Sequence, residues 1–267
     1  MKISKITTQK KNKQRYNIFI DYGSHEEYAF SVDEEVLITF ELRKGLALTD
    51  ELLQQIEAED NIQKAYNKVI NYLSYRMRTE QEIRTYLKKE EITEGQIHRI
   101  VNRLKDSDLI DDLEFAKMFV RTRMNTSVKG PGLIQKELHA KGISDQNAIM
   151  ALEQFPPEGQ KEKALKIAKK RLNRRSKHSF QKQLDQVRAA LIRNGYSADI
   201  VSKAIKEVAD YRNSDEEWEA IVHHGERFER RFSGKYSDYE ARQKIKEGLY
   251  RQGFHISLIN EYLESRS

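Results

Sequence analysis

Three glycine-bearing stretches of this chain follow one pattern, in which two apolar residues precede the glycine at intervals of four. In the first stretch Ile134 and Leu138 precede Gly142, and the two later copies end at Gly195 and Gly253. Residues four apart share one face of a helix, and glycine ends a helix readily because it adopts the left-handed conformation without a steric penalty. The stretches therefore predict the ends of a repeated helical unit and not a ligand-binding loop.

A fourth copy of the pattern lies nearer the N-terminus, where Glu91 replaces the glycine. The four anchor positions are about 50 residues apart, a period that suits three short helices per unit. In three copies a serine or threonine follows the turn and can cap the third helix; these residues are Thr93, Ser144 and Ser197. The middle helix is predicted to begin after Thr79 in the first unit and after Ser179 and Ser237 in the last two, where it is one turn longer.

The pattern predicts a mainly α fold built from four tandem three-helix repeats that stack on one another. The repeats are predicted at residues 61–110, 111–158, 159–212 and 213–267. Their first helices are expected at Ala65–Tyr75, Phe115–Arg123, Ala164–Leu172 and Trp218–Phe228.

The N-terminal segment, residues 1–60, has a different periodicity. Apolar and aromatic side chains alternate along residues 16–20 and 28–32, which predicts a small β-hairpin with a turn at 21–24. Asp33 is placed to cap a short helix that closes at Lys44–Gly45, and Thr49 is placed to cap another helix.

The composition favours an elongated chain of small modules over a compact globule, since 34% of the residues are charged and 38% are hydrophobic. There is no cysteine, which excludes disulfides and thiolate metal sites. The first residues lack the apolar core of a secretion signal, and no run reaches transmembrane length. We therefore expect a cytoplasmic monomer with no membrane contact.

Three features resemble catalytic or binding motifs, and each has a plainer interpretation. The aspartates of residues 106–112 suggest a metal site, but they lie between two repeats, where aspartate also caps helices. Adjacent His223 and His224 diverge on a helix and have no third ligand. The loop Lys129–Gly132 lacks the strand and the Gly-Lys-Ser/Thr ending of a phosphate loop, although a helix start that follows it can accept a phosphate weakly. No nucleophile has a convincing base, so we expect no enzyme, no metal and no cofactor.

Positive charge is concentrated, because ten lysines and arginines between Glu158 and Lys182 face only two acidic residues there, in a chain of net charge +6. Lys163, Lys166 and Lys170 share a predicted helical stripe, and a second stripe is predicted from Arg171, Arg174 and Arg175. Such stripes can follow DNA phosphates; the alternative is a solvated lysine-rich face. The DNA-binding candidates are Lys161, Lys163, Lys166, Lys169, Lys170, Arg171, Arg174, Arg175, Lys177, Lys182, Arg76, Arg78, Arg121, Arg123 and Lys129.

Three sequence blocks follow one another at the spacing of a known family: YRMRTEQEIRTYL at 75–87, LIDDLEFAKMFVRTR at 109–123 and KGPGLIQKELHAKGIS at 129–144. Together they resemble the RecX regulatory proteins of bacteria, in the longer form with a fourth repeat. The resemblance implies an elongated curved array that binds the RecA nucleoprotein filament and DNA of either strandedness without sequence specificity. It further implies inhibition of RecA in DNA repair and the SOS response. By the same resemblance, Asp111 or Asp112 caps a helix and Phe115 packs in a core.

Two other functions fit the residues. A stand-alone DNA-binding protein is one, because three-helix units resemble helix-turn-helix modules. A protein scaffold that does not bind DNA is the other, and it requires the lysine stripe to be only a solvated face.

Overall fold

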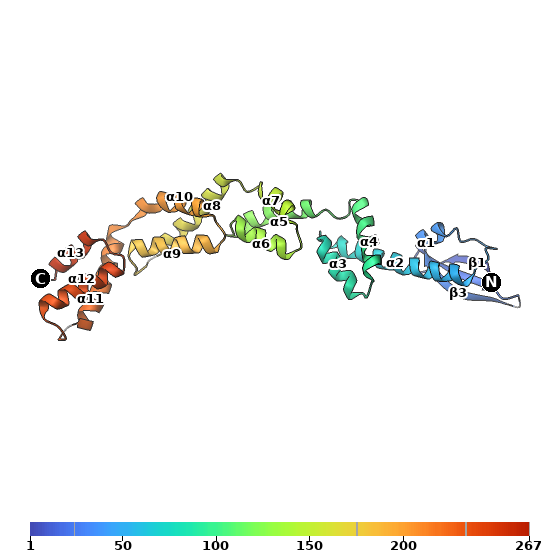
Figure 1. Ribbon diagram of the computed structural model, residues 1–267, viewed down its shortest axis with the longest axis horizontal. Helices are drawn as coiled ribbons and strands as arrows, with labels where there is room; N and C mark the ends of the chain where they lie inside the picture. Colours follow the sequence, from blue (N-terminus) through green and yellow to red (C-terminus); the bar gives the residue numbers. More distant parts are fainter. Residues whose placement is uncertain (24, 175, 233, 267) are drawn as a thin grey trace. The chain divides into compact units, whose positions relative to one another are not determined.

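The chain folds into two compact units, which are mostly helical (Figure 1). This computed structural model describes all of the 267 residues except Ser24, Arg175, Ser233 and Ser267. Unit 1 comprises Met1–Phe115 and the turn Lys141–Ile143, and unit 2 comprises Ala116–Ala140 and Ser144–Ser267.

The sheet of unit 1 contains the predicted hairpin and one further strand. Its antiparallel strands, in spatial order, are β1 (Lys2–Thr8), β2 (Arg15–Asp21) and β3 (Glu26–Asp33). The hairpin of β2 and β3 is confirmed, with Ile18 opposite Phe30. Strand β1 was not predicted because the lysines around Ile3 are typical of a solvated run, yet Ile3 is only 1% exposed in the core.

Helix α1 (Glu34–Thr39) begins as predicted, since the Asp33 carboxylate accepts a hydrogen bond from an amide of its first turn at 3.2 Å. The predicted closure at Lys44–Gly45 is wrong. Glu41 instead adopts the left-handed conformation with φ 46°, and the amide of Leu42 donates to a carbonyl of the last turn. The helix ends early because Leu42, 4% exposed, turns back into the core.

Helix α2 (Asp50–Ser74) is one continuous helix where two were predicted, and it runs through the predicted boundary at residue 60. The Thr49 hydroxyl caps it as predicted. The buried Asp60 carboxylate accepts two hydrogen bonds from the Arg15 guanidinium of β2, at 3.0 and 3.2 Å. Burial alone would raise the pKa of Asp60, but the hydrogen bonds from Arg15 and Lys64 outweigh burial and lower it. This charge pair joins the sheet to the middle of α2.

From the second half of α2 onward, the helices that the structure describes form four successive groups of three, which we refer to as repeats 1 to 4. Repeat 1 consists of the second half of α2, α3 (Glu80–Lys89) and α4 (Glu94–Asp106). Repeat 2 consists of α5 (Asp112–Thr126), α6 (Pro131–Ala140) and α7 (Asp145–Leu152). Repeat 3 consists of α8 (Pro157–Leu172), α9 (Phe180–Arg193) and α10 (Ala198–Val208), and Ala209–Tyr211 follows as a 3-10 turn. Repeat 4 consists of α11 (Ser214–Phe232), α12 (Asp238–Arg251) and α13 (Ile256–Glu264).

The middle helices differ in length as predicted, since α3 and α6 have 10 residues and α9 and α12 have 14. The turn after each of them is left-handed, with φ 82° at Gly142, 85° at Gly195 and 85° at Gly253. Glu91 has φ 60° at the same place in repeat 1. The predicted repeat register is therefore confirmed, and Glu91 departs from the sequence pattern without departing from the backbone conformation.

Two of these turns accept a hydrogen bond from the hydroxyl that caps an earlier middle helix. The Thr79 hydroxyl at the start of α3 donates to the Lys141 carbonyl at 2.8 Å, within unit 1. The Ser179 hydroxyl at the start of α9 donates to the Gln252 carbonyl at 2.5 Å, within unit 2. We call the contact between such a turn and such a helix start a turn joint.

A third turn joint, in unit 2, uses backbone groups alone. The amides of Gly130 and Gly132 at the start of α6 donate to the carbonyls of Asn194 and Gly195, at 2.7 and 3.0 Å. Each of the three glycine turns of the repeats is thus packed against the start of a middle helix.

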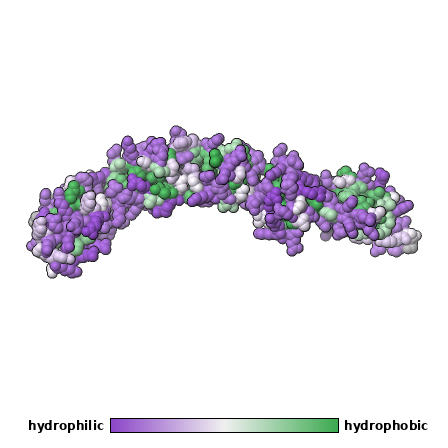
Figure 2. Space-filling view, viewed as in Figure 1, coloured by the Kyte–Doolittle hydropathy of each residue, from purple (hydrophilic) through white to green (hydrophobic). Residues whose placement is uncertain are grey.

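Repeats 1 and 4 each bury apolar side chains in a core formed by their own helices. In repeat 1, for example, Ile83 and Leu87 of α3 share a core with Ile97 and Val101 of α4. The face of the two units seen in Figure 2 is mostly hydrophilic, with small hydrophobic patches. Among the helices that the structure describes, none combines the length and the apolar composition that crossing a membrane requires.

Candidate nucleic-acid interface

Helix α8 is anchored on one side by buried apolar residues and carries cations over much of its remaining surface. Pro157 occupies its first position, where the missing amide has no consequence. Ala164, Ala168 and Leu172 are buried, and the helix packs against α10. Most of the remaining positions in its last three turns are lysine or arginine.

One side of α8 forms a wall of a cleft in unit 2, with a volume of about 890 Å³. The other walls come from the end of α5, the loop that follows it, and single residues of α6 and of the turn at Asn194. The cleft is lined by four of the predicted candidates, Lys129, Lys163, Lys166 and Lys170. The predicted stripe of Lys163, Lys166 and Lys170 therefore does lie together.

The four lysines of this lysine cleft differ in their partners. Lys163 donates to a backbone carbonyl at the end of α5, and burial together with the nearby charge of Lys166 lowers its pKa. Lys129 is bound to the carboxylate of Glu137. Within the described residues, the ammonium groups of Lys166 and Lys170 have no hydrogen bond or ion pair. These two lysines are the ones open to a new anion.

Two other candidates on α8 point toward α10 and its end. Lys161 forms an ion pair with Glu207 at 2.7 Å. The ammonium of Lys169 lies 5.0 Å from the centre of the Tyr211 ring, and a hydrogen bond with that tyrosine raises the pKa of Lys169. They are separate from the lysine cleft.

The predicted helical stripe of Arg171, Arg174 and Arg175 does not form. Helix α8 ends at Leu172, with Asn173 as its C-cap, so Arg171 stays on the helix and Arg174 lies in the following loop. The third arginine, Arg175, lies outside the described residues. The helix end at Leu172 agrees with the predicted range Ala164–Leu172, and a stripe that includes Arg174 would require the helix to continue beyond it.

The last two candidates of repeat 3 lie near the turn joint with repeat 4. Lys182 of α9 donates to the side-chain oxygen of Gln252 at 3.0 Å. Lys177 has an exposed side chain, while its backbone carbonyl lies 3.0 Å from Nε2 of the buried His224.

The four arginine candidates at helix ends already contact groups of the protein. The partners are the Glu82 carboxylate for Arg76, the Tyr72 ring for Arg78, the Gln154 side chain for Arg121 and the Glu137 carboxylate for Arg123. Burial would raise the pKa of Glu137, but Lys129 and Arg123 outweigh burial and lower it. Exposed ion pairs contribute little to stability, so these arginines can bind phosphate in place of their present partners. Each of them must first break its present contact.

The loop Lys129–Gly132 is not a phosphate cradle. A cradle needs free backbone amides, and those of Gly130 and Gly132 are used in the turn joint with Asn194 and Gly195. Pro131 between them has no amide hydrogen.

The aspartates between repeats 1 and 2 serve helix starts. The Asp111 carboxylate accepts two amide hydrogen bonds from the first turn of α5, at 2.8 and 3.0 Å, which confirms it as a cap. The Asp112 carboxylate accepts from the Glu80 amide at 2.9 Å. Phe115 is 7% exposed, which confirms its packing role. The described residues contain no group of three histidine, aspartate or glutamate side chains placed to hold a metal ion.

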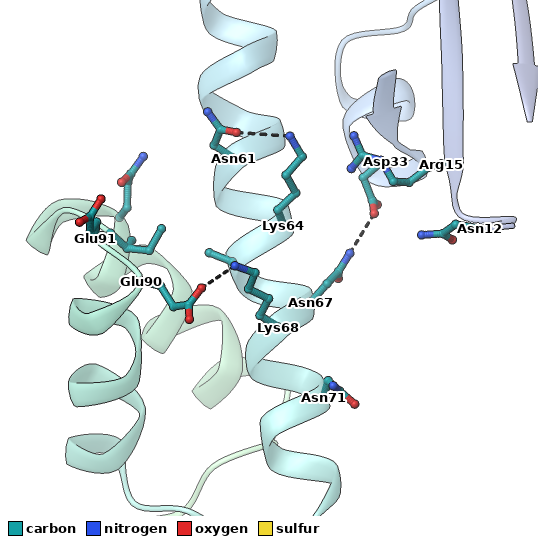
Figure 3. A pocket seen from close by; sticks show the side chains of 13 residues that line it. Asn12, Arg15, Asp33, Asn61, Lys64, Asn67, Lys68, Asn71, Glu90 and Glu91 are labelled. Atoms are coloured by element: carbon teal, nitrogen blue, oxygen red, sulfur yellow. Dashed lines mark hydrogen bonds and ion pairs between the residues drawn. The ribbon is translucent and has the colours of Figure 1, made fainter. Parts of the chain in front are cut away.

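Unit 1 has a polar cleft of about 740 Å³ along α2, between the β-segment and the turn after α3 (Figure 3). Glu90 points across it to Lys68, 2.5 Å away, and Asn67 donates to Asp33 at 2.9 Å. The cations of this polar cleft already have carboxylate partners, since Lys68 pairs with Glu90 and both Arg15 and Lys64 pair with Asp60. The sequence did not reveal it, since segments distant in the chain form its walls.

The lysine cleft also contains residues that the sequence did not single out. Asn125, Asn194 and Phe155 come from three separate segments and line one cavity. No periodicity connects such residues, so only the folded arrangement shows that they belong together.

Family comparisons match most of the chain. The RecX N-terminal domain matches residues 1–49, and the first, second and third RecX three-helix domains match 65–104, 111–152 and 215–263. The third of these three-helix domains corresponds to repeat 4 here, and repeat 3, with its lysine-rich α8, lies between the last two matched ranges.

Relatives of known name cover nearly all of the chain. Regulatory protein RecX of Oceanobacillus iheyensis is 43% identical over 98% of this chain and 97% of its own length. That of Halalkalibacterium halodurans is 40% identical over 98% of both chains. A crystal structure of a regulatory protein RecX, 41% identical, gives a TM-score of 0.71 over 77% of this chain and 98% of that one. RecX from Lactobacillus salivarius, 40% identical, gives 0.55 over 57% and 98%. At these identities and this coverage, the chain belongs to the family of RecX regulatory proteins.

Proposed function

We propose that this protein regulates RecA by binding the RecA–DNA filament, and that it inhibits recombination, ATP hydrolysis and co-protease activity. Membership of the RecX family supports a regulatory role toward RecA. Three-helix repeats support a binding function, because their stacked helices offer surfaces that a small module lacks.

The lysine cleft supports contact with the DNA of the filament. Lys166 and Lys170 lie one helical turn apart on a rigid element, and within the described residues neither has a partner to give up. Lysine recognises phosphate as a point charge, so the contact is not sequence-specific and applies to single and double strands. Each neutralised phosphate adds about 0.7–0.9 to the slope of log affinity against log salt concentration. This unpaired lysine pair is the observation on which the DNA contact depends.

The test compares two triple variants that change the net charge equally. The first is K166E/K170E/R174E, at exposed positions on α8 and just after it. The second is K10E/K11E/K13E, at exposed positions between β1 and β2. We expect the first to lower DNA affinity by about a hundredfold at low salt and to reduce the salt slope by about 2 to 3. The second should change both quantities much less, and both variants should keep the helical content of the wild type.

RecA's DNA-dependent ATPase and strand exchange are measured in the same series. Wild-type protein should inhibit both, and the α8 variant should inhibit them less. If saturating wild-type protein leaves both activities unchanged, regulation of RecA is wrong. Sequence-specific duplex binding without RecA would favour a stand-alone DNA-binding protein, and binding to protein but not to DNA would favour a scaffold.

A further inference from the structure

Part of the lining of the lysine cleft is apolar, which a phosphate contact does not need, and we call these apolar side chains the apolar floor. Apolar side chains contribute to it from α5, the loop after α5, α6, the segment before α8, and α8 itself. They are Met124, Val128, Leu133, Phe155 and Ile167. The DNA backbone exposes only phosphates and sugars, and the bases of a double helix are stacked and paired in its interior. Neither gives an apolar surface that would contact these side chains. A cleft lined by both apolar side chains and lysines therefore fits a ligand that carries a flat apolar group next to an anion.

Two amide side chains complete the polar lining. Those of Asn125 and Asn194 have no hydrogen bond within the described residues, although both line the cleft. An asparagine amide carries both donors and an acceptor, and the edge of a nucleobase carries both as well. The unpaired polar groups thus match a base with its phosphates better than they match a carboxylate alone.

The walls of the cleft are held in place before any ligand arrives. The Gly130 amide donates to the carbonyl of Asn194 at 2.7 Å, and the Tyr196 hydroxyl lies 3.4 Å from the Val128 carbonyl. The loop that carries Val128 and Lys129 is therefore fixed by the turn joint between repeats 2 and 3. A preformed cleft avoids the entropy cost of ordering a loop on binding.

Gly159 on the first turn of α8 keeps the cleft open. A Cβ built at Gly159 meets only the Phe155 ring, at 3.9 and 4.0 Å, which is ordinary van der Waals contact. A larger side chain can therefore be accommodated there without strain, and it would occupy the cleft.

We propose, on the basis of the proposed function, that the lysine cleft binds an unpaired base of single-stranded nucleic acid. The base lies on the apolar floor beside Val128 and Ile167, its edge meets Asn125 or Asn194, and the adjacent phosphates contact Lys166 and Lys170. The protein consequently favours single strands over duplex at equal phosphate content.

The first experiment removes the bases and keeps the phosphates. Anisotropy titrations compare an oligothymidylate of about 16 nucleotides with a strand of the same length made of abasic sites. We expect wild-type protein to bind the intact strand about tenfold more tightly, since removing the apolar face of one base from water has an effect of this order. Equal affinity for the two strands would overturn the proposal, and the apolar floor would then belong to a protein partner.

The second experiment fills the cleft without changing its charge. Gly159→Leu places a side chain over the floor, while Gly95→Leu on α4 is the matched control, because a Cβ at Gly95 meets nothing within 4 Å. G159L should lower affinity for the intact strand about tenfold and leave affinity for the abasic strand and the duplex unchanged. G95L should change none of the three affinities.

The two proposals fail differently. If K166E/K170E/R174E weakens binding to all three ligands while G159L weakens none, the base site is wrong and the DNA contact stands. If the charge variant weakens none of them, the DNA contact itself is wrong. The melting temperature of G159L, expected at or above that of the wild type because leucine favours a helix more than glycine, excludes unfolding as the cause of its effect.

Discussion

The turn at Gly195 in repeat 3 and the turn at Glu91 in repeat 1 share a backbone conformation and differ in their surroundings. A Cβ at Gly195 would lie 2.4 Å from the backbone nitrogen of Leu133. Glu91 instead lines the polar cleft of unit 1, next to the ion pair of Glu90 with Lys68 (Figure 3). The left-handed turn alone thus tolerates glutamate, and glycine is needed where a turn packs closely against a helix start.

The largest effect is expected from Gly195→Ala, because the new Cβ would meet backbone atoms of α6 and not a movable side chain. Strain in the left-handed conformation adds to the overlap, so we expect a loss of about 3 kcal/mol or more in the stability of unit 2. Denaturant unfolding followed by the fluorescence of Trp218, the single tryptophan of the chain, measures it.

Gly23→Ala is the matched control for conformation, since Gly23 also has φ 85° and a Cβ there meets nothing within 4 Å. Its loss should be about 1 kcal/mol, from the backbone alone. It is measured by hydrogen exchange in unit 1. Equal losses for the two variants would show that close packing does not explain the glycine.

A smaller effect is expected from Gly142→Ala. There the Cβ would lie 2.4 Å from the Cβ of Gln81 and 2.8 Å from its Cγ, so the overlap is with a side chain at the start of α3. We expect a loss of about 2 kcal/mol, measured by hydrogen exchange of the α3 amides. Adding Gln81→Gly should recover part of the loss, and strictly additive effects of the two changes would contradict this account.

Gly253→Ala should cost less again, about 1.5 kcal/mol. Its Cβ would meet the Ser179 hydroxyl oxygen at 3.0 Å, and a hydroxyl can rotate away at the expense of its hydrogen bond to Gln252. Trp218 fluorescence again follows the unfolding. In the G253A background, Ser179→Ala should cause almost no further loss of stability, because the hydrogen bond to Gln252 is already broken. A further loss as large as that in the wild-type background would mean that the hydrogen bond survives Gly253→Ala.

Charge distinguishes the turn joint at Gly142 from that at Gly253. The Glu82 carboxylate contacts Lys141 and Arg76 at 3.0 Å each, and Lys182 at the other joint meets only a neutral amide. Burial would raise the pKa of Glu82, but hydrogen bonds from Arg76 and Lys141 outweigh burial and lower it. A lowered pKa stabilises the folded state above the ordinary value of 4.5, and the gain is lost as pH falls through the lowered pKa.

Glu82→Gln should therefore cost about 1 kcal/mol at neutral pH, because glutamine keeps the capping contact and loses the charge. The difference between wild type and E82Q, followed by hydrogen exchange of α3, should shrink as the pH falls below about 4. A difference that is independent of pH would assign the effect to shape and not to charge.

The sequence predicted the repeat and the turns correctly because both depend on local physics. Apolar spacing such as that of Ile134 and Leu138 defines a helix face, and glycine ends it. It did not predict the turn joints, since the contact between Gly130 and Asn194 joins residues that no local pattern connects. Strand β1 was missed for the opposite reason, because abundant lysine obscured a short alternation around Ile3.

The candidate site was predicted in part, because helical spacing is local and the packing of distant segments is not. Helical spacing placed Lys163, Lys166 and Lys170 together, as the structure has them. Spacing could not show that Lys163 is engaged with a carbonyl of α5. Nor could it bring the Asn125 side chain to the same cleft, because that requires the packing of one repeat on the next.

The smallest effect among the turn variants, and a gain in stability, is expected from Glu91→Gly. A side chain at φ 60° is strained by about 1–2 kcal/mol, and glycine removes this strain. Glycine also makes the unfolded chain more flexible, which lowers the stability of the folded state by about 0.5–1 kcal/mol. We expect a net stabilisation of about 0.5 kcal/mol in the hydrogen exchange of α3 and α4, with no gain for Glu91→Ala, which keeps the Cβ. A loss on Glu91→Gly would mean that the glutamate is held in the polar cleft by its side chain. In that case repeat 1 would have glutamate at this turn because the side chain stabilises it. The contrast between Glu91 and the glycines of the other turns would then no longer be explained by close packing alone.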